Sequence, residues 1–231
     1  MLPGLAMQWR DFNTQLGALH EKHFALGPDA IRNNFAKAIA ALLLDAPSAA
    51  TSRLVAEKAP LNVLAFEDLA ALFPEAKFIH VIRDGRDVVV SLLERDWRNP
   101  RNGAAFPHVT NAGAAAAYWN GLANIGRKAE RAIGNSQRFF VLRYETLAHN
   151  PERTLHSLCK FLNASFDANL LKFYELELPL LGIERDSAAR LRKPISNDRV
   201  GRWRTKLTPA QNKLIERHAG PMLDAFGYKT N

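Results

Sequence analysis

The chain has 231 residues, of which 47% are apolar and 23% charged, so it is long enough for one sizeable globular domain. A single cysteine, Cys159, excludes an internal disulfide, and no run approaches the roughly 18 apolar residues of a membrane span. The net charge of +8 favours anionic partners, but the scattered basic residues do not indicate a nucleic-acid module. The opening residues lack a secretion signal, so we expect a soluble, cytoplasmic protein.

The first part of the chain alternates between helical and strand patterns. Helical spacing of apolar residues covers 5–25 and 29–45. RLVAEK (53–58) reads as a strand, LNVLAFEDLAALF (61–73) as a helix, and KFIHVI (77–82) as the next strand. A strand, a helix of about a dozen residues and a second strand form a parallel crossover unit.

The remainder continues the same alternation without an internal repeat or a convincing domain boundary. The expected elements are helices at 86–97, 114–133, 151–162 and 209–226, a strand at 138–147, a loop at 99–111 and a polar, basic segment at 183–204. The sequence therefore predicts one α/β domain over 1–231, with an open parallel sheet flanked by helices.

Polar residues end three of the predicted strands. Lys58 follows RLVAE, Arg83 follows FIHVI, and Tyr144 follows VLR. Because ligands of open parallel sheets bind beyond the carboxyl ends of the strands, we expect these three side chains to gather at one edge.

The segment after Arg83 has the character of an anion site. A helix is expected to begin near Asp87, and the free N–H groups of its first turn favour a nearby anion. Ser91 and Arg95 are four residues apart, so they share a helical face if the helix continues. Since a guanidinium matches the oxygens of a phosphate, Arg83, Ser91 and Arg95 predict a phosphate site.

Some of the charged residues allow a plainer interpretation. Asp84, Arg86 and Asp87 fit a solvated salt-bridge cluster at a turn better than a ligand site, and Arg83 could join it. The basic segment 183–204 fits a loop over a polyanion and an exposed loop equally well. Its cations are Arg185, Arg190, Arg192, Lys193, Arg199, Arg202 and Arg204.

Taken together, these motifs resemble the sulfotransferases that use 3′-phosphoadenosine 5′-phosphosulfate (PAPS), especially the tyrosylprotein sulfotransferase-like branch and its bacterial relatives. The resemblance runs from about Arg53 to Tyr228. It rests on four segments: EKAP (57–60), FPEAKFIHVIRDGRDVVVSLL (73–93), RYETLAHNPERTLHSLCKFLN (143–163) and VGRWRTKLTP (200–209). The resemblance implies the P-loop-like sulfotransferase fold.

The resemblance also assigns roles on the nucleotide side of the site. It implies that Arg83 and Ser91 bind the 3′-phosphate of PAPS, with Arg95 in support. Tyr144 would contact the nucleotide from the next strand end.

Further roles come from the basic segment and from the first predicted strand. Ser187, Lys193 and Ser196 would belong to a loop over the adenosine and its 3′-phosphate. Arg202 takes the place of a phosphate-binding lysine of the family. Lys58 would be catalytic, because a cation at the bridging oxygen stabilises the charge that develops as the sulfuryl group leaves.

The chain departs from the family pattern at its start. No segment resembles the glycine-rich loop that cradles the 5′-phosphosulfate, and the acidic catalytic base has no match. Ala59 replaces the usual Thr or Asp, and Glu57 should point to the opposite face from Lys58. We therefore expect an N-terminally incomplete domain that is poorly soluble or pairs with another copy of itself.

The predicted function is transfer of a sulfuryl group from PAPS to a hydroxyl or phenol acceptor, either a small molecule or a peptide, with no metal. Variable residues 96–118 would form the acceptor pocket. The alternative is a catalytically silent relative that only binds adenosine 3′,5′-bisphosphate. A P-loop nucleotide kinase is disfavoured, because the sequence has no Gly-x-x-x-x-Gly-Lys-Ser/Thr run.

Overall fold

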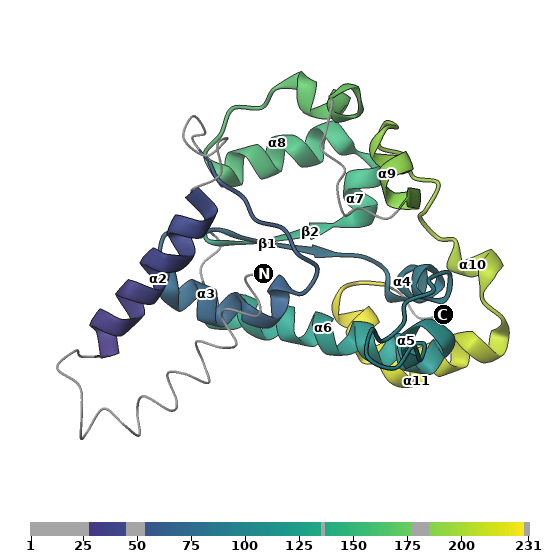
Figure 1. Ribbon diagram of the computed structural model, residues 1–231. Coiled ribbons are helices and arrows are strands. Elements are labelled where there is room, and N and C mark those ends of the chain that lie inside the picture. The colour runs from purple at the N-terminus through teal and green to yellow at the C-terminus, as the bar shows by residue number, and fades with distance from the viewer. Residues whose placement is uncertain (1–27, 45–53, 135–136, 177–184, 229–231) are drawn as a thin grey trace, which may run out of the picture. The chain divides into compact units, whose positions relative to one another are not determined.

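The computed structural model of the chain describes residues 28–44, 54–134, 137–176 and 185–228 (Figure 1). The chain divides into two compact units. The first comprises Met1–Phe78 and Ile125–Phe139, and the second comprises Ile79–Asn124 and Phe140–Asn231. No helix in the described ranges combines the length and the apolar character needed to cross a bilayer.

The first unit is mainly helical. Its elements are α2 (Pro28–Leu44), the 3₁₀ helix η1 (Asn62–Ala65), α3 (Phe66–Leu72) and the second half of α6 (Ala112–Ile133). Phe66 packs edge-on against Phe78 and Phe139, with ring centroids 5.3 and 5.8 Å apart. The Arg138 guanidinium donates to three carbonyl oxygens at and beyond the end of α3, those of Ala70, Phe73 and Ala76.

The strand predicted at 53–58 is wrong for its described part. Residues 54–58 have no regular secondary structure, and Leu54 and Val55 are 52% and 45% exposed. A strand needs a neighbouring backbone for its hydrogen bonds, and an apolar run does not reveal whether that neighbour exists. Lys58 is therefore an exposed residue of an irregular segment rather than the end of a strand.

The described strands form a small parallel sheet, which confirms the predicted α/β class. Strand β1 (Phe78–Ile82) pairs with β2 (Phe139–Arg143), and both belong to the second unit except for their first residues. The prediction extended the second strand to Leu147. Instead, the chain turns into helix α7 (Tyr144–His149) directly after Arg143.

The second unit has its core around the helix that follows β1. Figure 1 shows α4 (Gly85–Leu93), α5 (Pro107–Thr110) and α11 (Pro209–Ala225) beside the first half of α6. Val89, Trp119 and Leu223, from α4, α6 and α11, belong to one buried apolar cluster. The predicted start of α11 is confirmed by a capping box, in which the Thr208 hydroxyl accepts a hydrogen bond from the backbone N–H of Gln211.

The second unit also contains the helices after β2. They are α7, α8 (Pro151–Leu162), the 3₁₀ segment η2 (Ala168–Glu175), α9 (Arg185–Leu191) and α10 (Trp203–Lys206). Helix α8 has the predicted bounds, and its Cys159 is buried. Asn150 occupies the N-cap position, but its side chain makes no capping hydrogen bond.

Candidate functional site

Arg83, at the carboxyl end of β1, contacts the polar residue that follows β2. Its guanidinium lies over the Tyr144 ring, 4.6 Å from the centroid, and its Nη2 donates to the Arg199 carbonyl oxygen at 2.5 Å. The Asp87 carboxylate is 3.9 Å from the same nitrogen. The Nε atom of Arg83 is buried and has no hydrogen-bond partner among the described residues. One donor of this guanidinium is therefore buried and unsatisfied within the described residues.

A pocket of about 760 Å³ opens beside Arg83 and is rich in cations. Four of the predicted site residues line it, namely Arg83, Tyr144, Lys193 and Ser196. Arg190, Arg199 and Phe173 also line it. Within this described lining, Asp198 is the only acid, and it is engaged by Arg199 at 3.7 Å. A hydrogen bond from Ser196 holds the pKa of the Asp198 carboxyl below its ordinary value.

The two aspartates of the Arg-Asp-Gly-Arg-Asp turn are buried, so the interpretation as a solvated cluster is wrong. Asp87 is fully buried on α4, and its carboxylate accepts from the backbone N–H groups of Gly201 at 2.7 Å and Trp203 at 2.9 Å. The DGRD and VGRW segments of the sequence thus meet at one carboxylate. This contact holds the end of the basic segment against α4.

Asp84 and Arg86 form the ion pair that the sequence suggested, but inside the protein. Asp84 accepts from Arg86 Nε at 3.0 Å and from Nη2 at 2.8 Å, and the Arg86 guanidinium lies 3.9 Å from the centroid of the Trp203 ring. Asp84 also caps α4 by accepting from the Arg86 backbone N–H. The helix start was predicted to favour a bound anion, but a backbone N–H group there already donates to the Asp84 carboxylate.

Gly85 starts α4 where a side chain has no room. A Cβ atom at this position would lie 2.7 Å from the Trp119 ring, which packs directly on the backbone. The Trp119 indole N–H also donates to the Arg83 carbonyl oxygen at 3.2 Å. Trp119 therefore fixes the backbone that presents Arg83.

The other predicted phosphate ligands do not line the Arg83 pocket. Ser91 is half-buried on α4, one turn after Asp87. Helix α4 ends at Leu93, so the helical face predicted to include Arg95 does not extend that far, and the Arg95 guanidinium lies 5.8 Å from the centroid of the Trp97 ring. Ser187 lies in α9, and its side chain is outside the described part of the structure.

Arg202 binds the carboxylate of Glu94, the C-cap residue of α4, and does not line the pocket. It donates two hydrogen bonds to Glu94, one of them from Nη1 at 3.1 Å. This hydrogen bonding raises the pKa of Arg202 and lowers the pKa of Glu94. Arg199 lies 3.9 Å from the same carboxylate. In this structure, Glu94 therefore accepts two hydrogen bonds from the arginine that the resemblance assigned to phosphate.

Sequence reasoning missed the importance of Glu145, the first residue after Tyr144. One carboxylate oxygen accepts from the Asp84 backbone N–H at 2.8 Å, and the other accepts from the Tyr228 hydroxyl at 2.9 Å. The place of Glu145 directly after a strand-end residue was the available signal.

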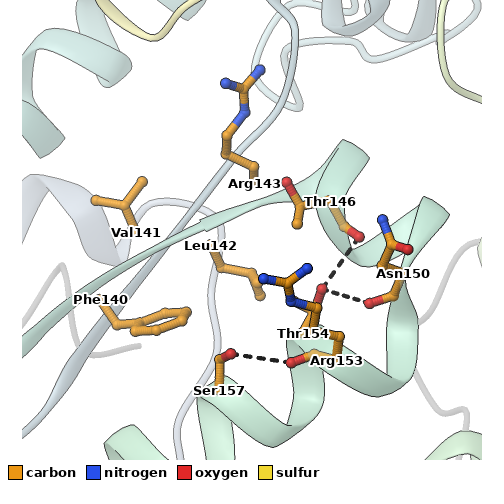
Figure 2. Close-up of a pocket in the computed structure, with 9 residues that line it drawn as sticks. All are labelled: Phe140, Val141, Leu142, Arg143, Thr146, Asn150, Arg153, Thr154 and Ser157. Atoms are coloured by element: carbon orange, nitrogen blue, oxygen red, sulfur yellow. Dashed lines mark hydrogen bonds between the residues drawn. The ribbon is translucent and has the colours of Figure 1, made fainter.

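A second pocket, of about 330 Å³, is lined by residues of β2, α7 and α8 (Figure 2). The Thr154 hydroxyl lies 2.7 Å from the Asn150 carbonyl oxygen and 3.2 Å from that of Thr146. The Arg143 guanidinium points away from these groups and lies over the Tyr228 ring, 4.4 Å from its centroid. Both of these lining side chains are thus engaged by the protein.

An α/β unit with a cationic pocket at the ends of parallel strands suits an anionic ligand, and comparison with known proteins identifies its class. The model of a family described as "Sulfotransferase family" matches residues 4–168. The chain belongs to the sulfotransferase family, and the predicted resemblance is confirmed.

Among its relatives is Protein-tyrosine sulfotransferase 2 of Gallus gallus, 29% identical over 189 residues, which cover 77% of this chain and 47% of the relative. Omega-hydroxy-beta-dihydromenaquinone-9 sulfotransferase Stf3 of Mycobacterium tuberculosis is 28% identical over 175 residues, covering 74% and 40%. The chain thus spans less than half the length of these two relatives.

A solved structure, the sulfotransferase domain from the curacin biosynthetic pathway, has a similar fold. Its TM-score is 0.66 at 21% identity, over 85% of this chain and 69% of that one. At this identity the likeness shows the fold alone, and it confirms the predicted sulfotransferase fold.

Proposed function

We propose that the Arg83 pocket binds the 3′-phosphoadenosine part of PAPS, and that the chain is a PAPS-dependent sulfotransferase acting on a hydroxyl or phenol. The observation that carries this proposal is the Arg83 guanidinium at the edge of a pocket whose lining cations outnumber its acid. A guanidinium matches the oxygens of a phosphate. Family membership supports the choice of PAPS over other phosphorylated ligands.

The residues present fit the nucleotide end of PAPS. Arg83 would bind the 3′-phosphate, Tyr144 would contact the nucleotide, and Lys193 and Ser196 would cover it from the basic segment. Ser91, Arg95, Ser187 and Arg202 remain predicted ligands. When bound, PAPS supplies the sulfuryl group and leaves as adenosine 3′,5′-bisphosphate.

Lys58 is the proposed catalytic residue. A lysine ammonium beside the bridging oxygen would stabilise the negative charge of the departing bisphosphate, and losing such a donor typically costs about 10²- to 10³-fold in rate. Lys58 is exposed on an irregular segment. Because an exposed lysine on an irregular segment is not held in place for catalysis, the second candidate function is binding of adenosine 3′,5′-bisphosphate without transfer.

The acceptor class is proposed from the relatives. The names of these two relatives specify a protein tyrosine and an omega-hydroxy dihydromenaquinone, and both carry a hydroxyl group. A sulfate-transfer assay with a phenol and with a primary alcohol separates the two candidate functions. Transfer to either acceptor supports the enzyme, whereas nucleotide binding without any transfer supports the silent relative.

Calorimetric titration with adenosine 3′,5′-bisphosphate and adenosine 5′-phosphate tests the binding proposal. Arg83→Ala should weaken binding of the bisphosphate about 10- to 100-fold, because a hydrogen bond to a charged group contributes roughly 1.5–3 kcal/mol. It should have little effect on the monophosphate, which lacks the 3′-phosphate. Arg217→Ala, an exposed arginine of α11, is the charge-matched control. Equal bisphosphate affinity of wild type and Arg83→Ala would remove the proposal.

A further inference from the structure

A polar chain connects the two strand ends to the last described residue of the protein. Tyr228 is 5% exposed and donates its hydroxyl hydrogen to Glu145 at 2.9 Å. Glu145 in turn accepts the backbone N–H of Asp84 at 2.8 Å. Each of the two carboxylate oxygens of Glu145 therefore has a donor.

The residues of this hydrogen-bonded network lie next to the candidate-site residues in the sequence. Asp84 directly follows Arg83, and Glu145 directly follows Tyr144. The hydrogen bond between Asp84 and Glu145 thus fixes the separation of the two backbones that carry the Arg83 guanidinium and the Tyr144 ring. These two groups are in contact, with the guanidinium carbon 4.6 Å from the ring centroid.

Tyr228 holds Glu145 in one orientation. Burial, with the Glu145 carboxylate nearby, raises the pKa of the Tyr228 hydroxyl, so the hydroxyl stays protonated and remains a donor at neutral pH. The Arg143 guanidinium lies over the Tyr228 ring, 4.4 Å from the centroid, and fixes the ring from the end of β2. A carboxylate with a donor on each oxygen cannot rotate without losing one of them.

We infer that Glu145 and Tyr228 are positioning residues for nucleotide recognition: through the Asp84 backbone, they hold Arg83 against Tyr144 in the geometry that selects a 3′-phosphate. The inference rests on the proposed function of the Arg83 pocket. In this role Glu145 transfers no proton and does not contact the ligand. Its role is exerted through Asp84 alone.

The test is the ratio of the affinities for adenosine 3′,5′-bisphosphate and adenosine 5′-phosphate. Glu145→Ala should lower this preference by about tenfold, the effect of losing one charge-assisted hydrogen bond. Glu145→Gln should retain most of it, because the amide oxygen can still accept from Asp84. Tyr228→Phe should lower it about two- to fivefold by releasing the carboxylate, an effect within the range of a single hydrogen bond.

Thermal unfolding of each variant separates positioning from stability. A purely structural role would lower the melting temperature and weaken both nucleotides equally, leaving the ratio unchanged, and this result would overturn the inference. Tyr174→Phe, at a tyrosine outside the described lining of the Arg83 pocket, is the matched control and should leave the ratio unaltered. If Glu145→Ala does not fold, Tyr228→Phe decides: an unchanged ratio overturns the inference and a lowered one supports it.

The same measurement distinguishes the two proposals. If Arg83→Ala leaves the ratio unchanged, the proposed function of the pocket fails, and the positioning role fails with it. If Arg83→Ala lowers the ratio while Glu145→Ala and Tyr228→Phe do not, the positioning role alone is wrong.

Discussion

The second unit contains two pockets near the end of β2. Residues of β2 and α7 line the smaller one, residues of α7 line the larger one, and the two pockets differ in the partners of their polar side chains. In the smaller pocket of Figure 2, the Thr154 and Ser157 hydroxyls bond to backbone carbonyls of α7, α8 and the residue between them. In the larger pocket, Arg83 retains a buried nitrogen without a partner and is accompanied by further cations. Among the described lining residues, the larger pocket has four cations and the smaller one has two, which favours the larger pocket for an anionic ligand.

The largest expected effect comes from Asp87, the buried carboxylate that holds Gly201 and Trp203 against α4. Asp87→Ala leaves two backbone N–H groups without acceptors, and we expect it to lower the free energy of unfolding by about 3 kcal/mol, at roughly 1–3 kcal/mol per unsatisfied group. Asp87→Asn keeps one acceptor oxygen and should recover part of the loss. Chemical denaturation measures both. A loss for Asp87→Ala below that of an ordinary surface substitution would show that the contact with Gly201 and Trp203 is not maintained in solution.

Arg83 and Arg153 allow the two pockets to be compared directly. Arg83 lines the larger pocket and Arg153 lines the smaller one. Arg83→Ala should weaken binding of adenosine 3′,5′-bisphosphate by about 30-fold, within the range expected for a lost charge-assisted contact, whereas Arg153→Ala should change it less than about twofold. Competition against a fluorescent nucleotide analogue gives both values. If Arg153→Ala has the larger effect, the assignment of the two pockets is reversed.

Thr154 tests whether the smaller pocket is only structural. Thr154→Val removes a hydroxyl that bonds to the Asn150 carbonyl, so the free energy of unfolding should fall by about 1 kcal/mol, the usual contribution of one hydrogen bond. Nucleotide affinity should be unaffected. Thermal denaturation and a nucleotide titration on the same sample check the two statements, and a change in affinity would contradict the second.

The smallest effect is expected at the exposed Glu94–Arg202 pair. The Glu94 pKa is lowered in the folded protein, so the pair contributes its full stabilisation above the ordinary glutamate value of 4.5 and loses it as the pH falls through the lowered value. Glu94→Gln should therefore be less stable than wild type at pH 7 by less than about 1 kcal/mol, and this difference should shrink as the pH falls below 4.5. A difference that does not change with pH would assign the effect to something other than the ion pair.

Local signals allowed several elements to be predicted from the sequence. Helix α8 begins at Pro151 and ends before Asn163, which adopts a left-handed φ of 56°. Helix α11 begins after the Thr208 cap. In each case the residues that determine the helix boundary lie within a few positions of it, so the sequence pattern is sufficient.

The elements that could not be predicted depend on distant parts of the chain. Residues 54–58 have the composition of a strand, but pairing requires a neighbouring backbone that no local pattern specifies. Asp87 was expected to be solvated, since nothing near it in the sequence supplies donors for a buried carboxylate. Its donors are the backbone N–H groups of Gly201 and Trp203, which lie 114 and 116 residues away. A carboxylate can be buried only when such donors satisfy it, and only the fold brings them to Asp87.

The candidate site was predicted in part for the same reason. Arg83 and Tyr144 were expected to lie close together because both follow parallel strands, and the structure brings them into contact. The contact between Glu145 and Tyr228 spans 83 residues and involves no shared motif. Their phosphate-binding and positioning roles remain predictions for the titrations to decide.

The burial of Asp87 also has a consequence for how a ligand could enter. Separating Gly201 from α4 would leave the buried Asp87 carboxylate without its backbone donors, so this contact anchors the end of the basic segment. The residues between α9 and Gly201 carry no comparable buried charge, and they include Lys193 and Ser196. Lys193 and Ser196 are exposed, so the anchor at Asp87 leaves this part of the pocket lining at the surface of the protein, where a ligand can meet it directly.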